Sequence, residues 1–134
     1  AALDQGTEVV LVHDAARPLV SAALVERLLA AAAVHPAVVP AVPVSDTVKR
    51  VRGGLVVETL DRASLVLVQT PQAFRVDLLR RALQGDDADA TDDAALVERL
   101  AEPVRTVAGD PLNLKVTTLR ELDLLRALLR AGIR

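Results

Sequence analysis

The chain has 134 residues, of which 51% are hydrophobic and 25% charged, and its formal net charge is −2. This length predicts one domain or part of one. The balance of 16 basic and 18 acidic side chains gives no reason to expect nucleic acid or a membrane surface as a partner. The absence of cysteine excludes disulfides, and we expect a cytoplasmic protein. No apolar run reaches the length of a membrane span.

A buried strand followed by polar residues opens the informative part of the chain. Residues 9–12 are all aliphatic, which predicts a strand buried on both faces, as in a parallel sheet covered by helices. Ligands of open α/β sheets bind beyond the carboxyl ends of the strands, so Asp14 and Arg17 stand where such a fold does its chemistry. Ala15 and Ala16 leave room for a ligand to approach the backbone.

The next elements in chain order are a helix, a strand and a hairpin. Ser21 is a candidate N-cap for an amphipathic helix that ends near residues 35–36. Residues 37–44 predict a second buried strand, in which two prolines favour an irregular or edge position. Residues 45–59 alternate polar with apolar side chains around Gly53-Gly54, which indicates a β-hairpin. A lone hairpin is marginal in water, so we expect it to rest on another domain or subunit.

The second half of the chain predicts three strands and three helices. The strands are expected at residues 65–69 (buried), 104–107 and 114–116 (brief). The first helix is expected from Phe74 to Leu83, and a polar loop at 85–89 follows it. The second helix has Thr91 as its N-cap. The third begins with a capping box at Thr118 and Glu121 and continues through Leu129. Strands that alternate with helices imply an α/β layered domain.

Three residues after the first strand are candidates for chemistry. The carboxylate of Asp14 could hold Mg²⁺, or it could cap nearby backbone amides. Arg17 could bind a phosphate through two parallel hydrogen bonds, or it could form a structural pair with an acid such as Asp14. His13 is expected to be a supporting residue, because the sequence places no serine or cysteine nucleophile beside it.

Two further groups carry charge near predicted loops. Lys115 precedes a capped helix, where it could meet an anion or simply be solvated. Asp110 could be a second metal ligand, although a turn-forming role is favoured. The hairpin residues Thr47, Lys49, Arg50 and Arg52 could form an anion-binding edge, but charges on an exposed edge also prevent aggregation. The sequence contains no P-loop, dinucleotide fingerprint, zinc spacing or nucleophile elbow.

Several short stretches, taken together and in order, are more specific than any one of them. They are Val12 to Pro18, Pro43 to Lys49, Asp61-Arg62, Thr70 to Phe74, Thr91 to Ala94, and Gly109 to Thr117. With these stretches the chain resembles the 2-C-methyl-D-erythritol 4-phosphate cytidylyltransferase family. The resemblance implies an α/β fold, a Rossmann-like nucleotidyltransferase sheet with flanking helices. Residues 1–134 would be the C-terminal portion of one such domain, and residues 45–59 a protruding β-arm that builds a homodimer.

The resemblance also implies roles for individual residues. Asp14 would position Mg²⁺ (or another divalent cation) and, with Ala15, the nucleotide. Arg17 and Lys115 would hold the phosphate of methylerythritol phosphate, and the catalytic residues would be Asp14, Arg17 and Lys115. Thr47 and Arg62 would reach the substrate in the neighbouring subunit. The reaction would be attack of the substrate phosphate on the α-phosphorus of CTP with release of pyrophosphate.

One part of the family pattern is missing from the sequence. The family opens with a strand and a glycine-rich loop whose Arg and Lys cradle the triphosphate, and nothing before Val9 can be that loop. The chain also contains no methionine, so we expect a portion of a longer protein that is inactive alone. Two alternatives stay open: a cytidylyltransferase for another sugar-alcohol phosphate, such as ribitol 5-phosphate, and a non-catalytic remnant whose hairpin mediates dimerisation.

Overall fold

The computed structural model describes residues 3–4, 6–85 and 90–133. Within them, five strands form a mixed sheet in the order β1-β6-β2-β5, with β7 also paired to β2. The strands are β1 (Val9–Val12), β2 (Ala37–Pro43), β5 (Val66–Val68), β6 (Gln72–Arg75) and β7 (Arg105–Ala108). β2 and β7 run parallel, while β1–β6, β2–β6 and β2–β5 are antiparallel pairs.

The strand β2 lies at the centre of this sheet, so of the two expected alternatives, an irregular or an edge position, the edge position is wrong. Its antiparallel neighbour changes along its length, from β6 at Ala37 and Val38 to β5 from Ala41 onward. Pro40 stands at this change of partner, where the antiparallel ladder is interrupted. A proline there removes no hydrogen bond from either antiparallel segment, which explains how a central strand accommodates it.

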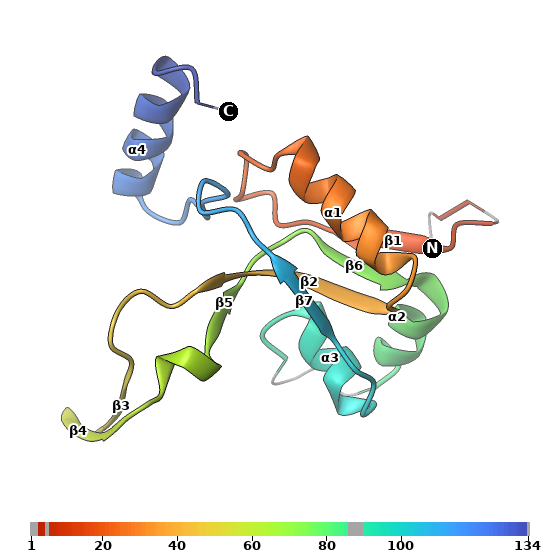
Figure 1. Cartoon of the computed structure of the whole chain (residues 1–134), viewed down its shortest axis with the longest axis horizontal. Coiled ribbons are helices and arrows are strands. Elements are labelled where there is room, and N and C mark those ends of the chain that lie inside the picture. Colours follow the sequence, from red (N-terminus) through yellow and green to blue (C-terminus); the bar gives the residue numbers. More distant parts are fainter. Residues whose placement is uncertain (1–2, 5, 86–89, 134) are drawn as a thin grey trace.

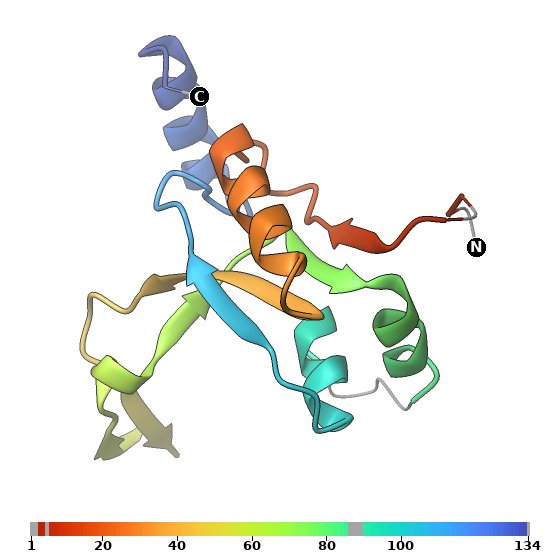
Figure 2. The ribbon, with the colours of Figure 1, turned by 45° about the vertical axis from the view of Figure 1, so that its right-hand side comes forward.

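Helices cover both faces of the sheet (Figures 1 and 2). On one face α1 (Ala22–Ala32) packs Leu24 and Leu28 against Val38 and Ala73. On the other face α2 (Val76–Ala82) and α3 (Asp93–Arg99) enclose Phe74 with their apolar side chains. Successive residues of β2 and β6 point to opposite faces, so one pair of strands supplies both cores. Ser21 caps α1 as predicted, since its side chain accepts from the Leu24 amide.

The predicted hairpin is confirmed as β3 (Lys49–Arg52) and β4 (Leu55–Thr59), which project from the sheet (Figure 1). Gly53 and Gly54 have φ values of 57° and 79°, the left-handed conformation that a tight hairpin turn requires. Every residue of both strands is exposed. A short 3₁₀ helix (Arg62–Ser64) leads from the hairpin back to the sheet.

The last helix, α4 (Leu119–Arg130), stands away from the sheet (Figure 1). The predicted capping box is confirmed, because the Thr118 hydroxyl accepts from the Glu121 amide while the Glu121 carboxylate accepts from the Thr118 amide. Leu125 is the one buried residue of this helix. Across the described parts of the chain, every helix is too short or too polar to cross a membrane.

Two strands, β1 and β5, are less buried than the sequence predicts. β1 is half-buried and antiparallel to β6, not a fully buried strand of a parallel sheet, because β6 is its one partner strand within the described sheet. β5 is exposed along its whole length although a buried strand was expected, because it continues the sheet toward the hairpin, beyond the helices.

Three boundaries also differ from the predictions. Phe74 belongs to β6, where the sheet buries it completely, and α2 starts two residues later. Asp92, not Thr91, caps α3, because its carboxylate accepts from the Ala95 amide. Residues 114–116 are not a strand; Val116 makes a single backbone bond to Ala16 in place of a ladder. Most of the loop predicted at 85–89 lies outside the described residues.

Candidate functional site

A cleft of about 420 Å³ lies beyond the end of β1, where the loops that follow β1, β5 and β7 meet. Its lining includes Asp14, Arg17, Thr70, Asp92 and Lys115. Three of the residues singled out in the sequence, Asp14, Arg17 and Lys115, are therefore brought together. A larger hollow of about 490 Å³ near Glu8 and Arg75 contains none of the predicted site residues. The smaller cleft is the candidate site.

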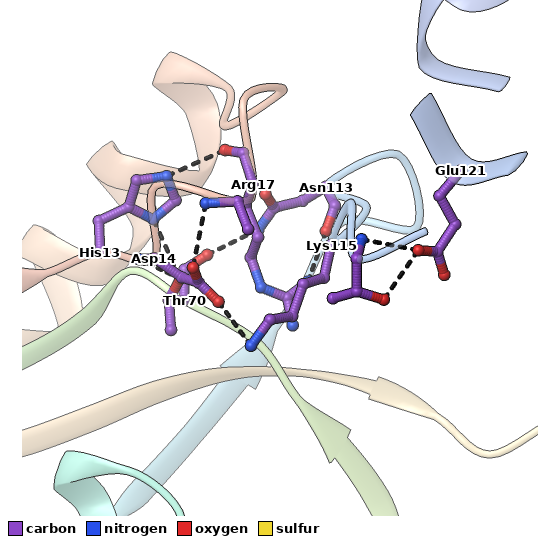
Figure 3. A network of polar contacts seen from close by, with 9 residues as sticks. His13, Asp14, Arg17, Thr70, Asn113, Lys115 and Glu121 are labelled. Carbon is purple, nitrogen blue, oxygen red and sulfur yellow. Dashed lines mark hydrogen bonds and ion pairs between the residues drawn. The ribbon is translucent and has the colours of Figure 1, made fainter. Parts of the chain in front are cut away.

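Asp14 is held at the cleft by contacts on three sides (Figure 3). Its Oδ2 atom lies 2.7 Å from Nζ of Lys115, and its Oδ1 atom accepts from the Ala16 amide at 3.0 Å. Its own amide donates to the Thr70 hydroxyl at 2.9 Å. The hydrogen bond from Lys115, with that from Ala16, lowers the pKa of Asp14, so the carboxylate is charged at neutral pH.

Arg17 is fixed by the main chain of a distant loop. Its Nη1 atom donates to the Asn113 carbonyl at 2.7 Å, and the fully buried Asn113 side chain donates to the Thr70 carbonyl at 2.7 Å. The ion pair of Asp14 is thus with Lys115, and the alternative of an Arg17–Asp14 pair is not what forms. Burial lowers the pKa of Arg17, and its Nε atom is buried without a hydrogen-bond partner.

His13 supports the loop that carries Asp14 and Arg17. Its Nε2 atom is 3.0 Å from the Arg17 carbonyl, and its Nδ1 atom is 3.1 Å from the Thr70 hydroxyl (Figure 3). A carbonyl can only accept, so Nε2 carries a proton. The ring therefore bridges the loop after β1 to the loop after β5, which fits the supporting role expected from the sequence.

Lys115 lies in a loop that is tied down on both sides. The Val116 amide donates to the Ala16 carbonyl at 2.8 Å, which joins this loop to the one that carries Asp14. Beyond it, the Glu121 carboxylate accepts from the backbone and hydroxyl of Thr117 and from the Thr118 amide. These bonds lower the pKa of Glu121 to about 2. The lysine is half-exposed but paired, so a freely solvated side chain is not observed.

A buried glutamine holds the opposite wall of the cleft. Gln72 is almost fully buried, donates to Oδ2 of Asp92 at 2.8 Å and accepts from the Ala94 amide at 3.1 Å. Asp92 lines the cleft, with its Oδ2 atom bonded to Gln72 and its Oδ1 atom capping α3. Burial and the neighbouring Asp92 raise the pKa of Asp93.

Sequence reasoning gave no role to Thr70, Gln72 or Asn113 and interpreted Asp92 only as an acid at the start of a helix, although all four lie in the stretches that carried the resemblance. For Thr70, the sequence does contain a signal that points to the site. Polar residues that follow a strand directly, as Gln69 and Thr70 follow β5, are placed at the sheet end where ligands bind. Asn113 gave no such signal, because its contacts depend on loops far apart in the sequence.

Thr47 and Arg62 do not join the cleft within one chain. Both are exposed, and Arg62 donates to the Ser45 carbonyl at 2.5 Å beside a separate hollow at the base of the hairpin. Lys49 and Arg50 bond across the hairpin to Thr59 and Glu58. Asp110 has the favoured turn-forming role, since its Oδ1 atom accepts from the Leu112 amide at 2.8 Å.

The donor set of the cleft fits a magnesium ion. Mg²⁺ commonly binds through one or two carboxylates, with waters and substrate phosphates as the other ligands. Asp14 and Asp92 both line the cleft, and each Asp14 oxygen accepts one bond and retains an unused lone pair. Among the described residues there is no cluster of three His, Cys, Asp or Glu side chains able to hold a metal alone. The site suits an ion that arrives with a phosphate ligand.

The family model of 2-C-methyl-D-erythritol 4-phosphate cytidylyltransferase (IspD) matches residues 1–131. The chain belongs to the IspD family. An enzyme of that name from Nocardia farcinica is 58% identical over 121 residues, which cover 89% of this chain and 52% of the relative. Its counterpart from Symbiobacterium thermophilum is 52% identical over 130 residues, which cover 94% of this chain and 55% of the relative. The chain thus spans about half the length of the curated relatives it matches.

Solved structures of the IspD family share the fold. The crystal structure of the enzyme from Thermus thermophilus matches with a TM-score of 0.83 at 43% identity and covers 92% of this chain and 62% of that one. The crystal structure of the 4-diphosphocytidyl-2C-methyl-D-erythritol synthase from Anaerococcus prevotii matches with a TM-score of 0.86 at 33% identity. The match covers 96% of this chain and 62% of that one. The expected α/β nucleotidyltransferase sheet with flanking helices is confirmed.

Proposed function

We propose that this chain forms the substrate and metal side of an enzyme that transfers CMP from CTP to 2-C-methyl-D-erythritol 4-phosphate, a step of isoprenoid precursor biosynthesis. One observation carries the proposal. In a chain that the IspD family matches over residues 1–131, Asp14, Lys115 and Arg17 line one cleft, and Nζ of Lys115 lies 2.7 Å from Asp14. Two cations and a carboxylate are the groups that a phosphate and a magnesium ion require.

The reaction needs positioning and charge neutralisation more than covalent help from the protein. A phosphate oxygen of methylerythritol phosphate attacks the α-phosphorus of CTP, and the bond to pyrophosphate breaks. Arg17 and Lys115 hold the attacking phosphate, whose negative charge would otherwise repel the nucleotide. Asp14 and the backbone at Ala15 face the nucleotide, and Asp14 holds Mg²⁺, which when bound neutralises charge on the phosphates.

The hairpin belongs to the same proposal as a dimerisation arm. Both of its strands are exposed on every residue, including Val51, Val56 and Val57, and β5 beside its base is exposed as well. A two-stranded hairpin gains stability when its apolar side chains are covered. In a homodimer a second copy covers them, and Thr47 and Arg62 at the arm reach the substrate bound in the partner.

A turnover assay tests the function. The protein that carries this sequence is incubated with CTP, methylerythritol phosphate and Mg²⁺, and pyrophosphate release is measured together with the mass of the nucleotide product. We expect the cytidine diphosphate conjugate of methylerythritol, and loss of activity with EDTA. The polypeptide of residues 1–134 alone is expected to be inactive, because it contains no glycine-rich triphosphate loop. Turnover of ribitol 5-phosphate in preference, or no turnover of either phosphate, overturns the proposal.

A further inference from the structure

The loop that presents Lys115 is anchored by main-chain bonds on both sides. On the side toward the sheet, the Val116 amide donates to the Ala16 carbonyl at 2.8 Å. On the side toward α4, a single oxygen of Glu121, Oε2, accepts three hydrogen bonds. They come from the Thr117 amide at 2.7 Å, the Thr117 hydroxyl at 2.8 Å and the Thr118 amide at 2.7 Å.

This is more than the end of a helix requires. In a capping box the acidic residue in the first turn accepts one bond, from the amide of the N-cap residue. Here Thr118 is that residue, and the two bonds from Thr117 are additional. Thr117 lies outside the helix, so these bonds fix the turn between Lys115 and α4.

The helix itself offers the loop little other restraint. Leu125 is the one buried residue of α4, while Leu119, Leu124 and Leu129 are exposed. The four-carbon stem of a lysine is flexible, so the direction of its ammonium group depends on how firmly its backbone is held. The three bonds to Glu121 are charge-assisted and therefore stronger than neutral ones.

We infer that Glu121 is a positioning residue for Lys115: its carboxylate fixes the Thr117–Thr118 turn and so holds Nζ of Lys115 against Asp14 in the cleft. Glu121 does not itself line the cleft. The effect on turnover rests on the proposed function, whereas the effect on Lys115 does not. The inference is therefore tested with one measurement of the position of Lys115 and one of turnover, both on the protein that carries this sequence.

Lysine acylation measures the position of Lys115 without reference to activity. The chain has two lysines, and Lys49 in the hairpin, bonded to Thr59, is an internal control. Peptide mass spectrometry after brief acetylation gives the ratio of labelling at Lys115 to labelling at Lys49. We expect Glu121→Ala to raise this ratio severalfold, because the ammonium group leaves Asp14, and Glu121→Gln to raise it less. An unchanged ratio overturns the inference.

Thr118→Ala is the matched control for helix stability. It removes the hydroxyl that accepts from the Glu121 amide but leaves the amides and the Thr117 hydroxyl that bind Glu121. We expect it to lower Tm while the Lys115 labelling ratio stays near that of the wild type. If Thr118→Ala raises the ratio as much as Glu121→Ala does at a comparable loss of Tm, Glu121 acts through the helix and the inference fails. Thr117→Val deletes one of the three bonds, the one from the Thr117 hydroxyl, and leaves α4 itself unchanged. We expect a Lys115 labelling ratio between those of the wild type and Glu121→Ala.

A double-mutant cycle connects the position of Lys115 to turnover. Glu121→Ala is expected to lower kcat/KM by about tenfold, the scale of a lost hydrogen bond to a charged group. In a Lys115→Ala background the same change is expected to have almost no further effect. Full additivity overturns the inference. If the labelling ratio rises as expected but the wild-type protein turns over neither phosphate, the proposed function is wrong and the positioning role of Glu121 is upheld.

Discussion

The Nζ atom of Lys115 and the Oδ2 atom of Asp14 are 2.7 Å apart although they lie in the last and first quarters of the chain. The pair joins two parts of the cleft lining that come from opposite ends of the sequence. It also keeps Asp14 ionised, since the lysine hydrogen bond lowers the pKa of that carboxyl. An anionic substrate that draws Lys115 toward itself would leave Asp14 free to bind a cation.

Replacing Asp14 with asparagine is expected to abolish most turnover while the fold remains. The amide keeps the shape of the side chain but loses the negative charge that Mg²⁺ requires. We expect kcat to fall by about 10²-fold or more, the scale for removing one preorganised electrostatic contact. Steady-state kinetics with a thermal unfolding control measure this. An unchanged kcat at saturating Mg²⁺ would contradict the metal role of Asp14.

The contribution of Glu121 to stability is expected to depend on pH. The pKa of Glu121 is lowered from 4.5 to about 2 in the folded chain, so the ionised carboxylate stabilises the folded state above pH 4.5. This stabilisation is lost as the pH falls toward 2. The Tm difference between the wild type and Glu121→Gln should therefore be largest near neutral pH and shrink in acid. Glu26→Gln, at an exposed position of α1, is the control. A Tm difference between the wild type and Glu121→Gln that grows in acid would contradict the prediction.

Gly109→Ala is expected to destabilise the protein. A Cβ atom at this position would lie 2.6 Å from Oε1 of Gln69 and 3.0 Å from the main chain of Ala41. The Gln69 side chain is buried and accepts from the Asp110 amide, so it cannot move without losing that bond. We expect a loss of about 1–3 kcal/mol in the free energy of unfolding, the usual cost of overpacking.

Gly85→Ala is the matched control for that substitution. Its Cβ would meet one atom, the Ala82 carbonyl oxygen at 3.5 Å, which is ordinary contact. Chemical denaturation of both variants measures the difference. Equal stabilities would show that the backbone at Gly109 yields more easily than the packing indicates.

Gln72→Leu is expected to be costly although leucine fits a buried position. The substitution leaves the buried Ala94 amide without its acceptor and Asp92 without one donor. We expect a loss of about 1–3 kcal/mol in the free energy of unfolding, the cost of an unsatisfied buried polar group. Gln84→Leu, at an exposed position just after α2, is the control and should change stability little. A stable Gln72→Leu protein would mean that the Ala94 amide finds another partner.

Complementation tests the sharing of a site between subunits. Chains with Arg62→Ala and chains with Asp14→Asn are each expected to be nearly inactive. In a mixed dimer one site would have both residues intact, so random mixing should restore about a quarter of the wild-type activity if the interface is two-fold symmetric. Unfolding and refolding the two variants together, followed by the turnover assay, measures this. Activity no higher than that of either parent would count against a shared site.

Local signals in the sequence predicted the elements well where neighbouring residues determine the structure. Ser21 at the start of α1, the Gly53-Gly54 turn and the capping box of α4 are satisfied by atoms within a few residues. The site residues Asp14, Arg17 and Lys115 were found because each follows a predicted strand or precedes a predicted helix, positions where ligands bind in this class of fold.

Burial and strand order could not be predicted in the same way. Pro40 favours an edge in isolation, yet β2 is central because its antiparallel partner changes at that residue. The valines of β5 predict burial, yet they are exposed because the sheet runs past the helices there. Asn113 and Gln72 bond to residues far away in the sequence, so only the folded chain reveals their contacts.

Several of the bonds that join the loops of the site run from a side chain to a main-chain carbonyl, such as Arg17 to Asn113 and Asn113 to Thr70. Any residue type supplies the same carbonyl, so a mutation at an accepting position keeps its half of the bond. A mutation of the donating side chain removes the bond. Each such bond therefore constrains the side chain of the donor and not that of the acceptor, although Asn113 and Thr70 are constrained in turn by the bonds of their own side chains. The architecture of the cleft therefore depends on a small set of donating side chains, Arg17 and Asn113 among them.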